Sequence, residues 1–409
     1  MDDPALPRLR DLPAYRTWLV ARVATALGTQ VQLAALGWGV WGTTEDPLDL
    51  AWLGLAQFLP ILLLALPAGT VADRVERRSV LVASMLGQAA LSALAAAVMA
   101  AGRMSPYAVV AIGLGMGTVR AFAGPASQAL LPALVPVAVL PRALATGSVG
   151  FQLALTVGPA LAGGVIGLGG GAAGALAVAA GLQLGGALVA TSLPALRLTR
   201  GAARWADLVG GLRYVLQTRV LLAVTTLDLF AVLLGGATAL LPIFATEVLG
   251  AGPELFGVLR SAPGAGAGAM ALWLARNPIH RRAGAHILGA VAVFGLATVA
   301  FALSRSVWLS VAALVVLGAA DMISVVVRQS VVQLQTPDEL RGRVSAVNLV
   351  FIGASNELGE FESGLTARLF GAVRAVVFGG VGTLAVVATW AVVFPELRTA
   401  DRLEVRRPG

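Results

Sequence analysis

The chain has no cysteine and no lysine, and its only histidines are His280 and His286. Without cysteine it cannot form disulfides, thiolate metal sites or iron–sulfur clusters. Both histidines fall near a predicted cytoplasmic loop, so we expect no histidine metal centre. A phosphate-binding loop is excluded because it needs a lysine. Since no nucleophile–base pair or metal constellation is evident, we predict that the protein is not an enzyme and uses no cofactor.

Charged residues are also scarce, at 12% of the 409 residues, whereas a soluble protein carries about 25%. Hydrophobic residues make up 58% of the chain, and they gather in runs of about 20 residues, the length that crosses a bilayer as a helix. We therefore predict an all-α polytopic protein of the lipid bilayer. The twelve predicted transmembrane helices are 16–43, 49–72, 79–101, 105–129, 143–168, 172–193, 219–247, 254–275, 284–304, 306–328, 344–371 and 376–394.

The net charge of +8 comes from 29 arginines, whose distribution follows the positive-inside rule. The connections between spans alternate between the two sides of the membrane. Arginines are concentrated at both termini and in the connections on one side, to which we assign Arg328 at the end of a span. The connections on the other side hold only Arg103, Arg305 and Arg374. This asymmetry predicts a multi-pass protein of the inner (plasma) membrane with cytoplasmic N and C termini. It also accounts for the positive charge without nucleic acid. No cleaved signal peptide is expected, because the first apolar run is too long for one.

The longest predicted cytoplasmic connection, 194–218, divides the spans into six and six. The spacing of its apolar residues from Trp205 to Leu216 is typical of a helix on the membrane surface, and a plain linker helix is the simpler interpretation. We predict an N-terminal six-helix lobe at 1–193, this linker with its amphipathic helix, a C-terminal six-helix lobe at 219–394 and a cytoplasmic tail at 395–409.

Charged residues interrupt the first, fourth, seventh, eighth, tenth and eleventh spans, but every third span is free of them apart from His286 at the edge of the ninth. A charge in hydrocarbon is costly and usually faces a protein interior or a water-filled path. Uncharged spans suit contact with lipid, while the others line a central cavity. Transporters made of three-helix repeats are arranged in this way, so we expect 3+3 inverted repeats in each lobe.

The loop after the second span carries Gly69, Asp73, Arg74, Arg77 and Arg78. An aspartate can bind amides at the start of a neighbouring helix, and arginines can bind carboxylates elsewhere. Contacts that form in one conformation and break in another would make a latch. Ordinary positive-inside anchoring is the alternative for the three arginines.

The spacing Gly-x-x-x-Asp-Arg-x-x-Arg-Arg in this loop resembles the signature of the major facilitator superfamily. Gly158, Pro159 and Gly163 in the fifth span resemble the antiporter motif of that family, and Arg120 resembles the buried arginine of its fourth span. The stretch 355–361 resembles the enterobactin-exporter-like branch, which is related to macrolide and multidrug efflux proteins.

This resemblance implies a proton-driven exporter that binds a small-molecule substrate and protons and works by alternating access; we expect a monomer. It implies that the loop from Gly69 to Arg78 forms the cytoplasmic gate and that Pro159 bends the fifth helix by removing a backbone donor. It also implies that Arg120 tunes a proton site or binds an anionic substrate group.

The chain departs from close relatives of this branch in the first half. Thr29 follows Gly28 in span one, where those relatives often carry an acid, and no acid lies deep in any span of the first half. The proton carrier is therefore expected in the second half, or at Asp73 at the membrane edge.

The candidates for proton coupling are the acids Asp228, Asp321, Glu357 and Glu360. Asp228 lies roughly 13 Å from the cytoplasmic start of its span, near the midplane, which makes it the first choice, with Glu357 second. These acids outnumber Arg120 and Arg260, the predicted charge partners, and a surplus of carboxylates in low dielectric favours a protonated form. Arg260 is expected to reach the Glu357/Glu360 face. The alternative is structural, with each acid paired permanently to an arginine.

Polar residues in the spans are candidates for hydrogen bonds to a substrate in a largely apolar cavity. Hydrogen bonds between helices are the alternative for each of them. The candidates are Gln30, Gln32, Trp38, Gln57, Gln152 and Asn356.

The leading hypothesis is a proton-coupled exporter of amphipathic small molecules of the drug or siderophore class. A proton-coupled nutrient importer of the same fold is the second hypothesis, and the motif in span five argues against it only weakly. A non-transporting membrane sensor is the third; it would usually carry an extra soluble domain, for which the predicted tails are too short.

Overall fold

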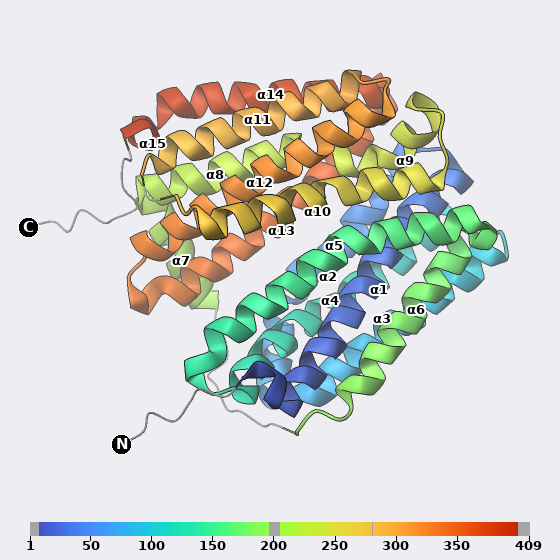
Figure 1. Cartoon of the computed structure of the whole chain (residues 1–409), viewed down its shortest axis with the longest axis horizontal. Coiled ribbons are helices and arrows are strands. Elements are labelled where there is room, and N and C mark those ends of the chain that lie inside the picture. Colours follow the sequence, from blue (N-terminus) through green and yellow to red (C-terminus); the bar gives the residue numbers. More distant parts are fainter. Residues whose placement is uncertain (1–7, 196–204, 280, 400–409) are drawn as a thin grey trace, which may run out of the picture. The chain divides into compact units, whose positions relative to one another are not determined.

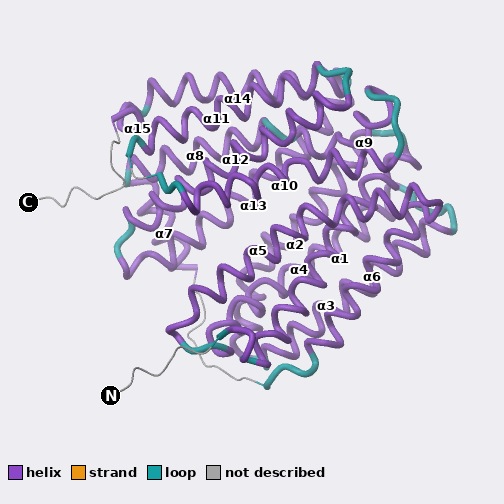
Figure 2. Tube along the Cα trace, in the orientation of Figure 1, coloured by secondary structure: helices purple, strands orange, loops and turns teal. Residues whose placement is uncertain are grey.

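Helices make up nearly all of the described chain. The computed structural model describes residues 8–195, 205–279 and 281–399, and Figure 1 shows helices joined by short connections. Figure 2 shows helices and loops but no strand in these ranges, so the predicted all-α fold is confirmed. The chain divides into two compact units: unit 1 comprises residues 1–44 and 56–203, and unit 2 comprises residues 45–55 and 204–409.

Unit 1 is a bundle of long helices centred on α1. Its helices are α1 (Pro13–Thr44), α3 (Arg77–Ala100), α4 (Pro106–Leu134), α5 (Leu140–Val165) and α6 (Gly171–Ala190), and α2 (Pro47–Arg74) contributes residues to both units. Helix α1 packs on α5 and α6, and α3 packs on α4 and α6. Tyr15 and Trp18 of α1 form a buried apolar cluster with residues of α3 to α6.

Local sequence determines where several helices begin. Pro47, Pro106 and Pro253 stand at helix starts, where the missing N–H costs nothing and the fixed φ suits the helix. The Ser105 hydroxyl caps α4 by accepting a hydrogen bond from the Ala108 backbone N–H at 3.3 Å, which satisfies one of the unpaired amides of the first turn.

The turn between α5 and α6 depends on glycine. A π-helical turn, Ile166–Gly170, follows α5, and the φ values of Gly169 and Gly171 are 91° and 60°. Residues with a Cβ rarely adopt this left-handed region. The glycine-rich stretch that marks the predicted boundary between spans five and six therefore forms the turn itself.

Unit 2 is a second helical bundle, with α12 at its centre. Its helices are α7 (Trp205–Gln217), α8 (Arg219–Leu234), α9 (Leu241–Ile243), α10 (Pro253–Arg276), α11 (Ala283–Leu303), α12 (Val307–Gln335), α13 (Asp338–Phe370), α14 (Ala372–Val393) and α15 (Pro395–Thr399). Helix α12 packs on α10 and α11, while α13 packs on α8 and α14 packs on α11. A buried cluster rich in valine and leucine joins α8, α11, α12 and α13.

The single span predicted at 219–247 is broken in the structure. Helix α8 ends before Gly235 and Gly236, and a 3-10 turn (Ala237–Leu240), α9 and a π-helical turn (Phe244–Val248) follow. A Cβ on Gly236 would collide with the backbone of Gly359 in α13. Glycine at this point lets α13 approach the break closely.

The predicted linker helix forms as α7, which packs on the start of α13. The Tyr214 hydroxyl donates a hydrogen bond to the Gln335 carbonyl at 2.9 Å, and a Cβ on Gly211 would collide with the backbone of Arg343. Residues 196–204 of the linker and 400–409 of the tail lie outside the described ranges. The predicted division of the chain at 194–218 therefore stays a prediction.

Nine segments of the described residues are long and apolar enough to span a membrane. They include Val137–Ala190 as one segment, although it turns at Gly169 and Gly171, and they leave out α10 and the charge-rich α13. The predicted count of twelve spans and the cytoplasmic orientation of the termini stay predictions.

Candidate functional site

The most deeply buried charges of unit 2 form an ion pair between α8 and α12. The Arg328 Nη2 atom lies 3.3 Å from the Asp228 Oδ2 atom, and both residues are buried, at 3% and 5% exposure. Asp228 occupies the middle of α8, whose neighbouring positions are apolar and packed. An arginine–carboxylate pair removed from water is held in place because either partner alone would be a buried, uncompensated charge.

Polar side chains on α12 and α13 complete this pair. The Ser324 hydroxyl donates to Asp228 Oδ1 at 3.4 Å, and Arg328 Nη1 donates to the Asn348 Oδ1 atom at 3.1 Å. Ser324 and Arg328 are four residues apart on α12 and so lie on the same face. The resulting network ties α8, α12 and α13 together.

A second carboxylate, Asp321, lies on the same side of α12. It precedes Ser324 by three residues, and it lines one small cavity together with Asp228. Asp321 forms no hydrogen bond or ion pair within the described ranges of the chain. The cavity is lined by Asp228, Ala231, Val232, Val291, Phe294, Ala320, Asp321 and Ser324. Two carboxylates thus share one buried site with a single arginine.

The partner of Asp228 was not foreseen from the sequence. The prediction placed Arg328 at the end of its span. In the structure, however, α12 continues seven residues beyond it to Gln335. Val331 and Val332 beyond it are buried, so the charge lies inside the bundle. The available signal was the spacing of Ser324 and Arg328, which places a donor and a cation on one helical face.

The predicted charge partners Arg120 and Arg260 contact uncharged groups. Arg120 Nη1 donates to the Gln57 Oε1 atom at 3.2 Å, and Arg260 Nη1 donates to the Thr238 carbonyl at 3.2 Å. Within the described residues neither guanidinium forms an ion pair. The expected approach of Arg260 to the Glu357/Glu360 face stays a prediction.

Glu357 and Glu360 share a face of α13, as their spacing predicts, and are not among the residues that line the Asp228 cavity. A Cβ on Gly54 in the first part of α2 would lie 3.2 Å from Glu360 Oε2 and 3.5 Å from Glu357 Oε2. The rings of Trp52 and Phe361 pack edge to face nearby, with centroids 5.4 Å apart. The two glutamates thus belong to a helix contact, and both have polar or electrostatic contacts of their own.

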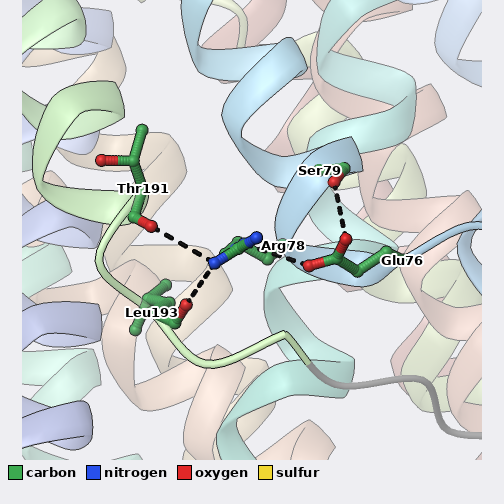
Figure 3. Close-up of polar contacts among 5 residues, drawn as sticks. All are labelled: Glu76, Arg78, Ser79, Thr191 and Leu193. Atoms are coloured by element: carbon green, nitrogen blue, oxygen red, sulfur yellow. Dashed lines mark hydrogen bonds and ion pairs between the residues drawn. The ribbon is translucent and has the colours of Figure 1, made fainter.

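Arg78 of the predicted gate loop binds within unit 1 (Figure 3). Its Nη1 atom donates to the Leu193 carbonyl at 2.9 Å and to the Thr191 carbonyl at 3.4 Å, and its Nε atom lies 3.0 Å from Glu76 Oε1. These carbonyls follow the end of α6, where a cation is favoured. Arg77 is buried at the start of α3. The latch role of Gly69, Asp73, Arg74, Arg77 and Arg78 stays a prediction.

Gly158 of the predicted antiporter motif brings α5 close to α1. A Cβ on Gly158 would collide with the Gln30 side chain. Gly158, Pro159 and Gly163 are all buried, and Pro159 lies inside the helix. The motif therefore has a packing role in unit 1, while its role in antiport stays a prediction.

The predicted substrate-cavity residue Gln32 bonds to other helices. Its Nε2 atom donates to Met116 Sδ at 3.2 Å, and its Oε1 atom accepts from Gln183 Nε2 at 3.3 Å. The Ser92 hydroxyl in turn donates to Gln183 Oε1 at 2.7 Å. This chain joins α1, α3, α4 and α6, so Gln32 serves helix packing. Gln183 and Ser92 were not among the predicted residues.

The other substrate-cavity candidates have varied surroundings. Gln57 is buried and accepts from Arg120, and Gln30 packs against Gly158. Asn356 is exposed. Trp38 and Gln152 each have polar or ring contacts. Their contact with a substrate stays a prediction.

Long apolar helices that bury charges are typical of a polytopic membrane protein with a functional site inside its helix bundle. The chain belongs to the transmembrane secretion effector family of the major facilitator superfamily, whose family model matches residues 7–407. It is therefore a secondary transporter and not an enzyme.

Several solved transporters have a similar fold. The nucleoside transporter NupG has a TM-score of 0.72 at 16% identity, covering 93% of this chain and 99% of that chain. A bacterial homologue of the human lysosomal transporter Spinster has a TM-score of 0.70 at 15% identity, covering 94% and 98%. A D-xylose–proton symporter has a TM-score of 0.67 at 14% identity, covering 92% and 97%. The comparison with curated proteins returned no match.

Proposed function

We propose that this transporter is a proton-coupled exporter of amphipathic small molecules, of the drug or siderophore class, that works by alternating access. The observation that carries the proposal is the second carboxylate, Asp321, in the cavity beside the Asp228–Arg328 pair. Intramembrane acids of this kind mark proton or ion routes in transporters.

The charge balance of the site supports a role in proton coupling. Asp228 has Arg328 as its counter-ion, so the fully ionised cluster of these two residues and Asp321 carries one excess negative charge. Binding of one proton neutralises the cluster, and its release restores the charge. Such a change can shift the equilibrium between two conformations if they solvate the cluster differently.

These contacts change the order of the candidates. Asp228 was the first choice by depth, but its carboxylate is engaged by Arg328 and Ser324. Asp321 forms no hydrogen bond or ion pair among the described residues, and it lines the cavity. We therefore place the exchanged proton on Asp321, with Asp228 and Arg328 fixing the local field.

Export rather than import is supported by the description of the matching family, which concerns secretion. A proton-coupled nutrient importer is the alternative, since a D-xylose–proton symporter has a similar fold. Proteoliposomes with a pH gradient imposed in either direction separate the two. An exporter exchanges substrate for protons that move the opposite way, whereas a symporter moves both together.

A bacterial host without its own efflux pumps tests the proposal. Expression of the wild-type chain should lower the accumulation of amphipathic drugs or raise siderophore secretion, and a protonophore should abolish either effect. Asp321→Asn should abolish it too, because an amide cannot carry the proton. Glu362→Gln is the matched control, since this α13 carboxylate accepts a bond from the Thr366 hydroxyl. Export that survives both the protonophore and Asp321→Asn would overturn the proposal.

A further inference from the structure

We infer that unit 1 carries a binding site for the anionic group of an amphipathic substrate, formed by Arg22 of α1 and Arg120 of α4. The substrate role of this site rests on the proposed transport function. The site itself follows from two arginines without acidic partners, an open space between them and nearby donors without acceptors.

Arg120 supplies one cation of the site. It is half-buried in α4, and its Nη1 atom donates to the buried amide oxygen of Gln57 at 3.2 Å. No carboxylate lies within ion-pair distance of Arg120 in the described ranges. A guanidinium has five donors in a planar fork, so one amide oxygen leaves most of them available.

Arg22 supplies the second cation. It is half-buried in α1, its Nη1 atom donates to the Ser127 hydroxyl at 3.3 Å, and its guanidinium lies over the Trp18 ring, 5.2 Å from the centroid. The Nε atom of Arg22 and the indole Nε1 atom of Trp18 are buried donors without an acceptor among the described residues. Trp18 is 2% exposed. Buried donors are usually satisfied, so two adjacent unsatisfied ones indicate a place for an acceptor.

Helix α4 brings the two cations to one face. Ser127, which binds Arg22, follows Arg120 by seven residues, about two turns or 10 Å along the helix. Gly124 lies between them on the same face, and a Cβ there would meet nothing within 4 Å. By contrast, Gly117 lies against the Gln57 backbone and Gly115 against Leu91. Of these three glycines only Gly124 has open space at its Cβ position, and it lies between Arg120 and Ser127 along α4.

The chemistry of the site favours an anion. Half-buried arginines in a membrane span are costly unless they have a partner, and carboxylates, phosphates and sulfonates match the guanidinium fork with charge-assisted bonds. Gly124 leaves room for the group, and the apolar helix surfaces around it suit the rest of an amphipathic molecule. A cationic molecule of equal size would be repelled by both arginines.

Equilibrium dialysis with two ring-matched probes tests the site. The full chain in phosphatidylcholine nanodiscs, with empty nanodiscs subtracted, should bind naphthylacetate at least about tenfold more tightly than naphthylmethylammonium. Arg22→Gln and Arg120→Gln should each weaken naphthylacetate binding by about tenfold, the value of one lost charge-assisted bond. Gly124→Leu should abolish it by filling the space. Gly185→Leu is the matched control, because a Cβ on this α6 glycine also meets nothing within 4 Å.

The outcomes are separable from those of the proposed function, because no proton gradient is imposed. Equal affinity for the two probes, or wild-type affinity in Gly124→Leu, would overturn the anion site. Displacement of naphthylacetate when phosphatidylglycerol replaces part of the lipid would assign the site to a headgroup and overturn the substrate assignment. Selective anion binding without any proton-driven export would remove the proposed coupling and leave the site standing.

Discussion

Units 1 and 2 both hold charges within their helices, but the sign in excess differs. In unit 1, Arg22 and Arg120 have no acidic partner among the described residues, and each binds an uncharged side chain. In unit 2, Arg328 is paired with Asp228, and Asp321 adds a second carboxylate to the same cavity. The contrast suggests a division of work, in which unit 1 binds an anion and unit 2 exchanges a proton.

The way each unit joins its helices differs as well. In unit 1, uncharged side chains form the hydrogen bonds that join the helices, namely those of Gln32, Gln183 and Ser92. None of these groups gains or loses a charge by binding a proton. Unit 2 uses the Asp228–Arg328 ion pair with hydrogen bonds to its neighbours. Helix packing in unit 2 is therefore the more sensitive of the two to a change of charge.

The largest expected effect on stability comes from breaking that ion pair. Asp228→Ala removes the ion-pair partner of the buried Arg328 and should lower the free energy of unfolding by about 3–5 kcal/mol, measured as a lower midpoint of thermal unfolding in detergent. Replacing both residues, Asp228→Ala with Arg328→Met, should restore most of the loss, because the buried arginine that lost its ion-pair partner is then removed as well. A double variant no more stable than the single one would contradict this explanation.

Crowding the α1–α5 contact of unit 1 should have the next largest effect on stability. Gly158→Val would push a side chain into Gln30 and should cost about 1–3 kcal/mol, as overpacking usually does. Gly185→Val has open space around its new side chain and should stay within about 0.5–1 kcal/mol of the wild type, because valine is a better helix former than glycine. Equal melting temperatures of the two variants would argue against close packing at Gly158.

Arg78→Gln should have a smaller effect, confined to the end of α6. It removes charge-assisted bonds to the Leu193 and Thr191 carbonyls and should cost roughly 1 kcal/mol, since the site is partly exposed. Hydrogen exchange of the amides at 187–193 should rise more than exchange elsewhere in unit 1. If transport falls while hydrogen exchange of the amides at 187–193 is unchanged, Arg78 acts as part of the predicted latch. It would then not be needed to stabilise the C-terminal end of α6.

The smallest expected effect on stability is that of Asp321→Asn. Asp321 has no hydrogen bond or ion pair in the described ranges, so the amide should leave the midpoint of thermal unfolding close to the wild-type value. Comparing the thermal stability of Asp321→Asn with that of Asp228→Ala distinguishes the roles of the two carboxylates. We expect Asp228 to stabilise the fold and Asp321 to exchange the proton. A large loss of stability in Asp321→Asn would show that this carboxylate is also a structural partner.

Much of the fold follows from the sequence, because hydrophobic runs and glycines act locally. The all-α fold follows from these runs, although the span predicted at 219–247 is broken after Leu234. Gly169 and Gly171 turn the chain between the spans predicted at 143–168 and 172–193. The partner of Asp228 was missed because the predicted span ended at Arg328, whereas α12 continues to Gln335.

The polar network of unit 1 was not predictable for a different reason. Whether Gln32 meets Gln183 depends on how α1 and α6 are rotated against each other, and apolar spans with weak periodicity do not determine that rotation. Arg22 lies only six residues into the predicted span 16–43, so its depth does not mark it as a candidate. Its contacts with Trp18 and Ser127 depend on tertiary packing in the same way.

Proton movement in proteoliposomes tests the central claim most directly. With a pH-sensitive dye in the lumen, and with the signal of protein-free liposomes subtracted, addition of naphthylacetate should change the luminal pH for the wild-type chain and for Glu362→Gln, and should give no remaining change for Asp321→Asn. A luminal pH change in Asp321→Asn equal to that of the wild type would contradict the account, because the exchanged proton would then not reside on Asp321.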